Sequence, residues 1–209
     1  IIFVDNFIKK KISIDNKIFS IFIFVLMISS TSSASEYRPK NFEEIIGQDA
    51  IVKTLNNAIE KDNIPQALLF CGPRGVGKTS CARILAKTIN NIEEDFEYNI
   101  FELDAASNNS VEDIRNITDQ IRIPPQKGRY KVYIIDEVHM LSNQAFNAFL
   151  KSLEEPPEHV VFILATTEKN KILPTILSRC QIYDFKKVDN KSITNLLIKI
   201  CKEKKIKHQ

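Results

Sequence analysis

Five short apolar runs punctuate the sequence from Tyr37 onward. They are rich in Ile, Val, Leu and Phe and alternate little with polar residues, which is typical of strands buried on both faces of a sheet. The runs cover residues 67–71, 100–103, 131–136, 160–165 and 181–185. We therefore predict five strands in one sheet.

Apolar residues at a spacing near 3.6 lie between these runs and predict helices. The clearest sets are Ile51, Leu55, Ala58 and Ile59; Val111, Ile114, Ile117 and Ile121; and Phe146, Phe149, Leu150 and Leu153. Ser110 opens the second set with Asp113 three residues later, which resembles a capping box. Strands that alternate with helices predict an α/β fold with a parallel sheet and helices on both faces. From Asp189 the pattern turns helical again.

The first 35 residues differ from the rest. Lys9–Lys11 precede an apolar run over residues 18–28, and a Ser/Thr/Ala stretch follows over residues 29–35. That order imitates a secretory signal, although the run is short for a bilayer span. The chain begins with Ile rather than Met. We interpret residues 1–35 as translated upstream sequence or a fragment boundary in preference to a true signal or anchor.

Composition limits the number of domains and the classes of site but does not by itself indicate a function. A chain of 209 residues can form one full domain and part of a second, and 44% apolar residues suffice for a core. The net charge of +3 is weak and does not by itself argue for nucleic acid. None of the four cysteines forms a C-x-x-C pair, so neither a zinc knuckle nor a disulfide framework is indicated. We expect Cys71 and Cys81 to be small buried hydrophobes in a reducing compartment.

A glycine-rich stretch carries the strongest chemical signal. Residues 72–79 fit G-x-x-x-x-G-K-[ST] at every fixed position, between a predicted strand and a predicted helix. Its glycines allow backbone N–H groups to turn around phosphate oxygens, and the helix N-terminus adds to the attraction. Lys78 is expected to reach the β- and γ-phosphates of ATP, and the Thr79 hydroxyl to ligate Mg²⁺. The expected phosphate-binding residues are Gly72, Pro73, Arg74, Gly75, Val76, Gly77, Lys78, Thr79 and Ser80.

A second set of candidate residues follows later predicted strands. Asp136 ends the run 131–136 and is expected to hold Mg²⁺ directly or through water, while Glu137 polarises the attacking water. Thr166 and Thr167 follow the run 160–165 and would lie beside the γ-phosphate if that strand neighbours the acid-bearing one. Paired with the phosphate loop, the two acids predict hydrolysis in addition to binding.

Several separate stretches together resemble the AAA+ ATPases, and within them the bacterial clamp-loader gamma/tau subunits of DNA polymerase III. The resemblance runs from about Tyr37 to the C-terminus. It rests on Tyr37-Arg-Pro-Lys-Asn-Phe42, Ile46-Gly-Gln48, the loop 72–79, Glu102-Leu-Asp-Ala-Ala-Ser-Asn108, Asp136-Glu-Val-His139, Phe149-Leu-Lys-Ser-Leu-Glu-Glu-Pro-Pro157, Ala165-Thr-Thr-Glu168 and Leu177-Ser-Arg-Cys180. The last three stretches are the most specific to clamp loaders.

The resemblance implies roles for further residues. An adenine pocket would be lined by Tyr37, Arg38, Pro39, Ile45, Ile46 and Gly47. Thr167, or its neighbour Thr166, would sense the γ-phosphate, and Arg179 would act in trans on the ATP of an adjacent subunit. Such a trans-acting arginine is worth roughly 10³–10⁵ in rate.

The resemblance also implies an organisation and a set of partners. Residues 36–186 would form the AAA+ ATPase domain, and residues 187–209 the beginning of a truncated helical lid domain. The partners would be the other subunits of a hetero-pentameric clamp loader, the sliding clamp, and primer–template DNA contacted through its backbone. A cytoplasmic location without membrane contact follows. The zinc module usual in the family should be absent, because residues 88–98 contain no cysteine.

Three other interpretations stay open at this point: a eukaryote-like clamp-loader small subunit, a branch-migration helicase, and a non-hydrolysing clamp-loader scaffold. The Asp-Glu-Val-His, Leu-Glu-Glu-Pro-Pro and Ser-Arg-Cys stretches favour the bacterial loader over the first two. Intact Lys78, Thr79, Asp136 and Glu137 speak against the scaffold. We find no polymerase active site in the sequence, so a polymerase label would describe a holoenzyme that contains this chain.

Overall fold

A computed structural model describes residues 37–91, 99–126 and 128–203. The prediction for residues 1–35 therefore lies outside the described residues. The prediction that the zinc module is missing concerns residues 88–98, which are only partly described. Two compact units are present. One comprises residues 39–189 and contains the whole sheet; the other contains Tyr37, Arg38 and the helix α8 (Asn190–Glu203). Each is described by itself.

A five-stranded parallel sheet forms the centre of the larger unit, in the order β2-β3-β4-β1-β5. The strands are β1 (Ala67–Cys71), β2 (Ile100–Asp104), β3 (Lys131–Asp136), β4 (Val160–Thr166) and β5 (Gln181–Asp184). All five lie where the apolar runs predicted them, with ends that agree to within a residue. The order brings β1 and β3 to either side of β4, so the carboxyl ends of three buried strands meet at one edge of the sheet. Ligands of open α/β sheets bind at that edge.

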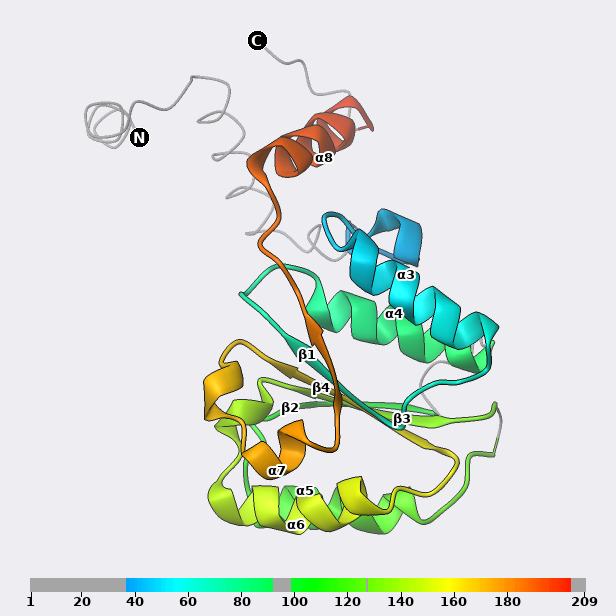
Figure 1. Cartoon of the computed structure of the whole chain (residues 1–209), viewed down its shortest axis with the longest axis vertical. Coiled ribbons are helices and arrows are strands. Elements are labelled where there is room, and N and C mark those ends of the chain that lie inside the picture. The colour runs from blue at the N-terminus through cyan, green and yellow to red at the C-terminus, as the bar shows by residue number, and fades with distance from the viewer. Residues whose placement is uncertain (1–36, 92–98, 127, 204–209) are drawn as a thin grey trace, which may run out of the picture. The chain divides into compact units, whose positions relative to one another are not determined.

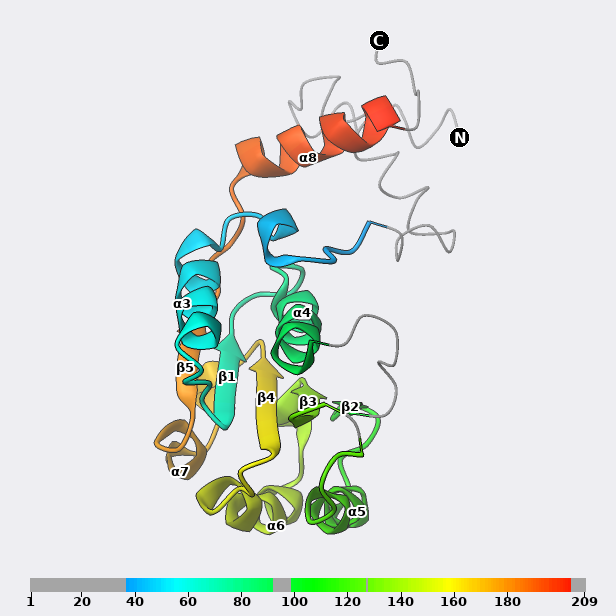
Figure 2. The same ribbon diagram turned by 90° about the vertical axis from the view of Figure 1, so that its right-hand side faces the viewer.

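Helices cover both faces of the sheet, as predicted (Figure 1). Figure 2 shows α3 and α4 on one side and α5, α6 and α7 on the other. The helices are α3 (Asp49–Glu60), α4 (Lys78–Asn90), α5 (Val111–Ile121), α6 (Asn143–Glu154) and α7 (Pro174–Leu177), with short 3₁₀ turns η2 (Phe42–Glu44), η4 (Val138–Met140) and η5 (Lys169–Lys171). Two apolar cores result, one on each face of the sheet.

Burial differs between the strands, and one prediction was wrong in part. Every residue of β1 and β4 is buried, and so is every residue of β3 except its last. In β2 and β5, by contrast, exposed and buried positions mix, and Ile182 of β5 is 36% exposed. The expectation that all five strands are buried on both faces therefore fails for β2 and β5. Each is an edge strand, with a neighbour on only one side, and the covering helices reach it incompletely.

Local signals account for the helix boundaries. The Ser110 side chain accepts from the Asp113 amide, and the Asp113 side chain accepts from the Ser110 amide, which confirms the capping box at the start of α5. Ser142 caps α6 in the same manner by accepting from Ala145 N–H. Among the helices that the structure describes, none combines the length and the apolar character needed to cross a bilayer.

Candidate nucleotide-binding site

The glycine-rich loop joins the end of β1 to the start of α4. Gly75 and Gly77 have φ of 75° and 98°, a left-handed backbone that favours glycine. Gly72 is required for a different reason, because a Cβ atom there would lie 2.6 Å from the carbonyl oxygen of Phe185. The loop therefore needs glycine for its turns and for its close approach to the chain that follows β5. Gly77 also precedes the first turn of α4, where no side chain among the described residues caps the helix. The amides of that turn are left for an anionic group.

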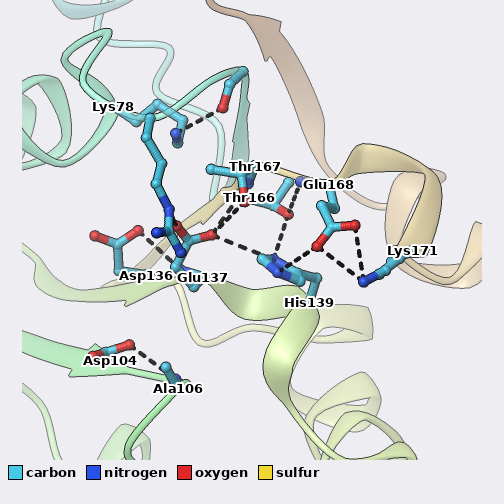
Figure 3. Close-up of polar contacts among 12 residues, drawn as sticks. Lys78, Asp104, Ala106, Asp136, Glu137, His139, Thr166, Thr167, Glu168 and Lys171 are labelled. Carbon is cyan, nitrogen blue, oxygen red and sulfur yellow. Dashed lines mark hydrogen bonds and ion pairs between the residues drawn. The ribbon is translucent and has the colours of Figure 1, made fainter. Parts of the chain in front are cut away.

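Lys78 is buried at the first position of α4 and is 6% exposed. Its Nζ donates to the carbonyl oxygens of Gly72 and Pro73, both at 2.8 Å, so the side chain folds back over the loop (Figure 3). Burial lowers the pKa of the Lys78 ammonium, and the nearby carboxylates of Glu137 and Asp136 oppose that shift. Among the described residues, the hydrogen-bond acceptors of this ammonium are the two carbonyl oxygens, and phosphate oxygens are acceptors of the same kind.

Thr79 and Asp136 meet although 57 positions separate them. The Thr79 hydroxyl donates to Asp136 Oδ2 at 2.7 Å, and Asp136 Oδ1 accepts from the Glu137 amide at 2.9 Å. A hydroxyl and a carboxylate side by side are the hard oxygen donors that Mg²⁺ uses, with phosphate oxygens and water completing the octahedron. The pair expected from the sequence to bind Mg²⁺ thus fits the metal in both chemistry and placement.

Glu137 follows β3 directly and is held from two sides. Its backbone is left-handed, with φ of 47°, which is strained for a residue with a side chain. Its Oε1 lies 3.6 Å from Arg74 Nε of the loop, and its Oε2 accepts from the Thr167 hydroxyl at 2.9 Å and the Thr167 amide at 3.3 Å. The side chain is 19% exposed. The carboxylate is therefore fixed beside the phosphate loop while still reachable by water.

The two threonines at the end of β4 have different surroundings. The sequence predicted that these threonines lie near the γ-phosphate if their strand neighbours the strand that ends in Asp136. The structure meets that condition, because β4 pairs with β3. Thr166 is fully buried, and its hydroxyl lies 3.0 Å from His139 Nδ1 and accepts from the Glu168 amide at 3.0 Å. The Thr167 hydroxyl contacts Glu137. Of the two threonines, Thr167 is therefore the one that contacts Glu137 beside the loop, while the γ-phosphate-sensing role stays a prediction.

Two residues with contacts around the site received no role from the sequence. His139 lies beside Glu137 and Glu168. Gln48 is buried, with its Nε2 donating to the Lys186 carbonyl at 2.7 Å and its Oε1 accepting from the Lys186 amide at 3.1 Å. Both residues belong to sequence stretches on which the family resemblance rests. That was the one feature of the sequence that could have pointed to them.

Other predicted residues lie apart from this cluster. Arg179 precedes β5, whose first residue pairs with Leu68 near the start of β1, so it lies toward the opposite end of the sheet from the loop. Its guanidinium donates to Glu154 Oε1 and to the Thr175 carbonyl oxygen, both at 2.6 Å. Of the expected adenine pocket, Ile45 is buried, while Tyr37 and Arg38 belong to the other compact unit. The adenine pocket and the trans role of Arg179 stay predictions.

Comparison with known proteins decides the family. The sequence pattern of a family described as "DNA polymerase III, delta subunit" matches residues 47–189, which is more than half of the chain. This chain belongs to that family of DNA polymerase III subunits. Its relatives include the DNA polymerase III subunit tau of Bacillus subtilis, 49% identical over 78% of this chain and 32% of that protein. The Escherichia coli subunit tau is 44% identical over 84% of this chain and 30% of that protein. The chain thus spans about a third of the length of these relatives.

Solved structures agree on the fold of this DNA polymerase III subunit relative. A gamma-subunit-related protein of Thermotoga maritima is 28% identical with a TM-score of 0.56, over 66% of this chain and 46% of that one. The RuvB Holliday junction branch migration motor of the same organism is 23% identical with a TM-score of 0.64, over 81% of this chain and 55% of that one. The second likeness shows the fold alone. The fold class predicted from the sequence, a parallel five-stranded sheet flanked by helices, is confirmed.

Proposed function

We propose that this chain is an ATP-hydrolysing, Mg²⁺-dependent subunit of a bacterial clamp loader, which places a sliding clamp on primer–template DNA. The observation that carries the proposal is the contact of Thr79 with Asp136, since it joins the phosphate loop to the acidic strand end. Glu137 comes directly after that strand and faces the loop through Arg74. A phosphate-binding loop, a metal-binding oxygen pair and a water-activating acid are the parts that phosphoryl transfer to water requires.

Each residue then has a defined task. ATP with Mg²⁺ supplies the phosphoanhydride bond and spreads the charge that develops when that bond breaks. The loop amides and Lys78 bind phosphate oxygens, with Lys78 leaving the carbonyl oxygens of Gly72 and Pro73. Thr79 and Asp136 would hold Mg²⁺ through their side-chain oxygens. Glu137 accepts hydrogen bonds from the attacking water and orients it, which requires that the Thr167 hydroxyl turn from Glu137 toward the γ-phosphate.

The wider assignment rests on the family. We propose that Arg179 serves the ATP of a neighbouring subunit, that Pro39 and residues 45–47 of the larger unit contribute to adenine binding, and that the chain acts in the cytoplasm. Other loader subunits, the clamp and the DNA backbone are the proposed partners. The exposed position of Arg179, with its side chain 32% exposed, is compatible with reaching a second subunit.

Steady-state ATP turnover of the 209-residue chain with Mg²⁺ tests the hydrolytic assignment. We expect Lys78→Ala to lower turnover at least about 100-fold, because it removes a buried cation from the developing phosphate charge. Lys53→Ala, at an exposed position of α3, is the matched control and should leave turnover unchanged. Turnover that survives Lys78→Ala would sink the assignment.

A branch-migration motor is the second candidate, because RuvB aligns with more of the chain than the gamma-related structure does. The far higher sequence identity to tau subunits favours the loader. The two differ in what stimulates hydrolysis. Addition of a sliding clamp with primed DNA should raise turnover of a loader subunit, whereas stimulation by four-way junctions alone would favour the motor.

A further inference from the structure

His139 occupies the 3₁₀ turn η4 immediately after the acidic strand end. Its side chain is only 5% exposed, yet it is surrounded by polar and charged groups. Figure 3 shows the imidazole between Glu137 on one side and Glu168 on the other, with Thr166 nearby. A buried imidazole among charged groups is restrained by its hydrogen bonds and contacts, so its surroundings fix its orientation.

Both ring nitrogens have partners. Nδ1 lies 3.0 Å from the Thr166 hydroxyl and 3.4 Å from Glu137 Oε2, and Nε2 lies 3.3 Å from Glu168 Oε1. Glu168 is in turn anchored by Lys171, whose Nζ lies within 3.0 Å of both of its carboxylate oxygens. A continuous set of contacts therefore runs from η5 through the imidazole to the acid beside the phosphate loop.

The two oxygens of Glu137 are treated differently by this arrangement. Oε2 faces the interior, where Thr167 and His139 contact it. Oε1 faces the loop, where its neighbour is Arg74, a side chain that is 87% exposed. One oxygen is thus restrained by buried groups, and the other lies near the loop, where its partner among the described residues is the solvated Arg74.

We propose that His139 is a positioning residue for ATP hydrolysis: it holds Oε2 of Glu137 so that Oε1 stays turned toward the phosphate loop and the attacking water. Glu168 and Thr166 orient the imidazole for this task. The inference rests on the proposed function, since it gives Glu137 a water to activate. Removing a residue that orients a metal ligand typically costs about 10–100-fold in activity, and we expect a loss of the same order for a residue that orients Glu137.

Three substitutions separate positioning from packing. His139→Phe keeps a planar ring and removes both nitrogens, so we expect kcat to fall about 10–100-fold with little change in KM for ATP. His139→Asn places an amide nitrogen where Nδ1 stood, next to Thr166 and Glu137, and should recover most of the activity. His139→Gln places its amide nitrogen where Nε2 stood, next to Glu168, and should recover little.

The matched control is His159→Phe. His159 is a part-buried histidine whose Nε2 contacts the Ile121 carbonyl oxygen at 2.9 Å, next to the start of β4 and away from the loop. It should leave kcat unchanged even if the melting temperature falls. If the Asn and Gln variants lose activity equally, or if the losses follow the melting temperature and raise KM, His139 is a packing residue and the proposal is overturned.

A second measurement does not depend on turnover. The Thr167 amide donates to Glu137 Oε2, so its hydrogen exchange reports whether that oxygen is held. We expect exchange of this amide to accelerate several-fold in His139→Phe and to return toward the wild-type rate in His139→Asn. Unchanged exchange in His139→Phe overturns the inference even if the chain hydrolyses ATP. Absent wild-type turnover with the expected exchange pattern overturns the proposed function and leaves His139 only as the residue that holds Oε2 of Glu137.

Discussion

The phosphate-loop region and the Arg179 region of the same sheet are built in opposite ways. Around the loop, Lys78 and Thr166 are buried, and hydrogen bonds join α4, β3 and β4. Around Arg179 the contacts are to Glu154, Thr175 and Ser178, all at exposed positions. The first region is assembled by the sheet order, whereas the second lies at the surface beside an edge strand.

This difference separates the two halves of the proposed chemistry. The residues that would bind and hydrolyse the chain's own nucleotide are held in place by contacts within the chain, without a second subunit. Arg179 is held by a surface ion pair, which is a weak interaction and easily exchanged for another anion. We infer that the phosphate-loop region is pre-organised, whereas the Arg179 region gains its function only when a second subunit brings a nucleotide to it.

Arg179→Ala gives the largest expected effect and tests this division directly. In the assembled loader, ATP turnover should fall by roughly 10³–10⁵, the range found where a trans-acting arginine neutralises γ-phosphate charge. In the isolated chain it should not change. Steady-state turnover with and without the other subunits measures both, and Arg115→Ala, at another exposed arginine, is the control. An equal loss in the isolated chain would place Arg179 in its own site and remove the contrast.

Glu137→Gln tests the pre-organised half. The amide is isosteric but uncharged and has one acceptor oxygen in place of two, so it orients and polarises the water poorly, and turnover should fall by about 10²–10⁴ while nucleotide binding is retained. Single-turnover hydrolysis and the binding of a fluorescent ATP analogue separate the two quantities. Glu155→Gln, at an exposed position at the end of α6, is the control. If binding is lost together with turnover, Glu137 serves to hold the nucleotide or its metal.

The sequence was informative wherever a signal is local. The buried strands β1 and β3 end where the apolar runs end, and the Ser110–Asp113 capping box was readable because its two residues are three apart. The phosphate loop was readable for the same reason. The Asp136 and Glu137 pair gained meaning only through the loop, yet its placement at a strand end was also local.

What depends on strand order was not readable. Nothing in the composition of β2 and β5 says that each has a neighbour on one side only, so their burial was misjudged. Thr166 and Thr167 are adjacent in sequence, and only the pairing of β4 with β3 distinguishes their surroundings. The contacts of His139 likewise join residues from the ends of two strands.

Gly72→Ala should destabilise the fold at the junction of loop and sheet. The added Cβ would lie 2.6 Å from the Phe185 carbonyl oxygen and 2.9 Å from Phe185 Cβ, so backbone must shift. Gly75→Ala is the control, because it carries a left-handed strain but meets no atom within 4 Å. We expect Gly72→Ala to lower the free energy of unfolding by about 1–3 kcal/mol more than Gly75→Ala does, measured in urea. Equal losses would show that the loop yields as easily as a surface turn.

The phosphate-loop region and the Arg179 region should also differ in the reactivity of their cysteine thiols. Burial raises the pKa of Cys71 to about 11 and that of Cys180 to about 12, so both are protonated at pH 8 and react only through opening. Cys71 is 3% exposed, whereas Cys180 is half-buried beside the Arg179 region. We expect iodoacetamide to label Cys180 faster, on the order of tenfold, which corresponds to about 1.4 kcal/mol of opening free energy.

Mass spectrometry of the labelled peptides measures the ratio of the two labelling rates.

Both pKa values lie above the ordinary thiol value of 9.0, so the folded state keeps these protons after the unfolded chain has lost them. The stability that the two thiols contribute is therefore present below pH 9 and is lost as the pH rises toward 11 for Cys71 and toward 12 for Cys180. Equal labelling rates at pH 8 would mean that the two regions open together.

Glu154→Gln is expected to have the smallest effect on the free energy of unfolding, and a small effect is what the comparison of the two regions predicts. The change removes the charge that pairs with Arg179, but both side chains are partly exposed, at 47% and 32%, so water screens the pair. The free energy of unfolding should fall by about 0–1 kcal/mol. A double-mutant cycle with Arg179→Ala, followed by urea unfolding, isolates the pair from other contacts of either residue. A coupling above about 2 kcal/mol would mean that the Arg179 region is built as firmly as the phosphate-loop region, because exposed pairs do not reach that value. A small coupling leaves the guanidinium free to exchange Glu154 for a phosphate at little energetic expense.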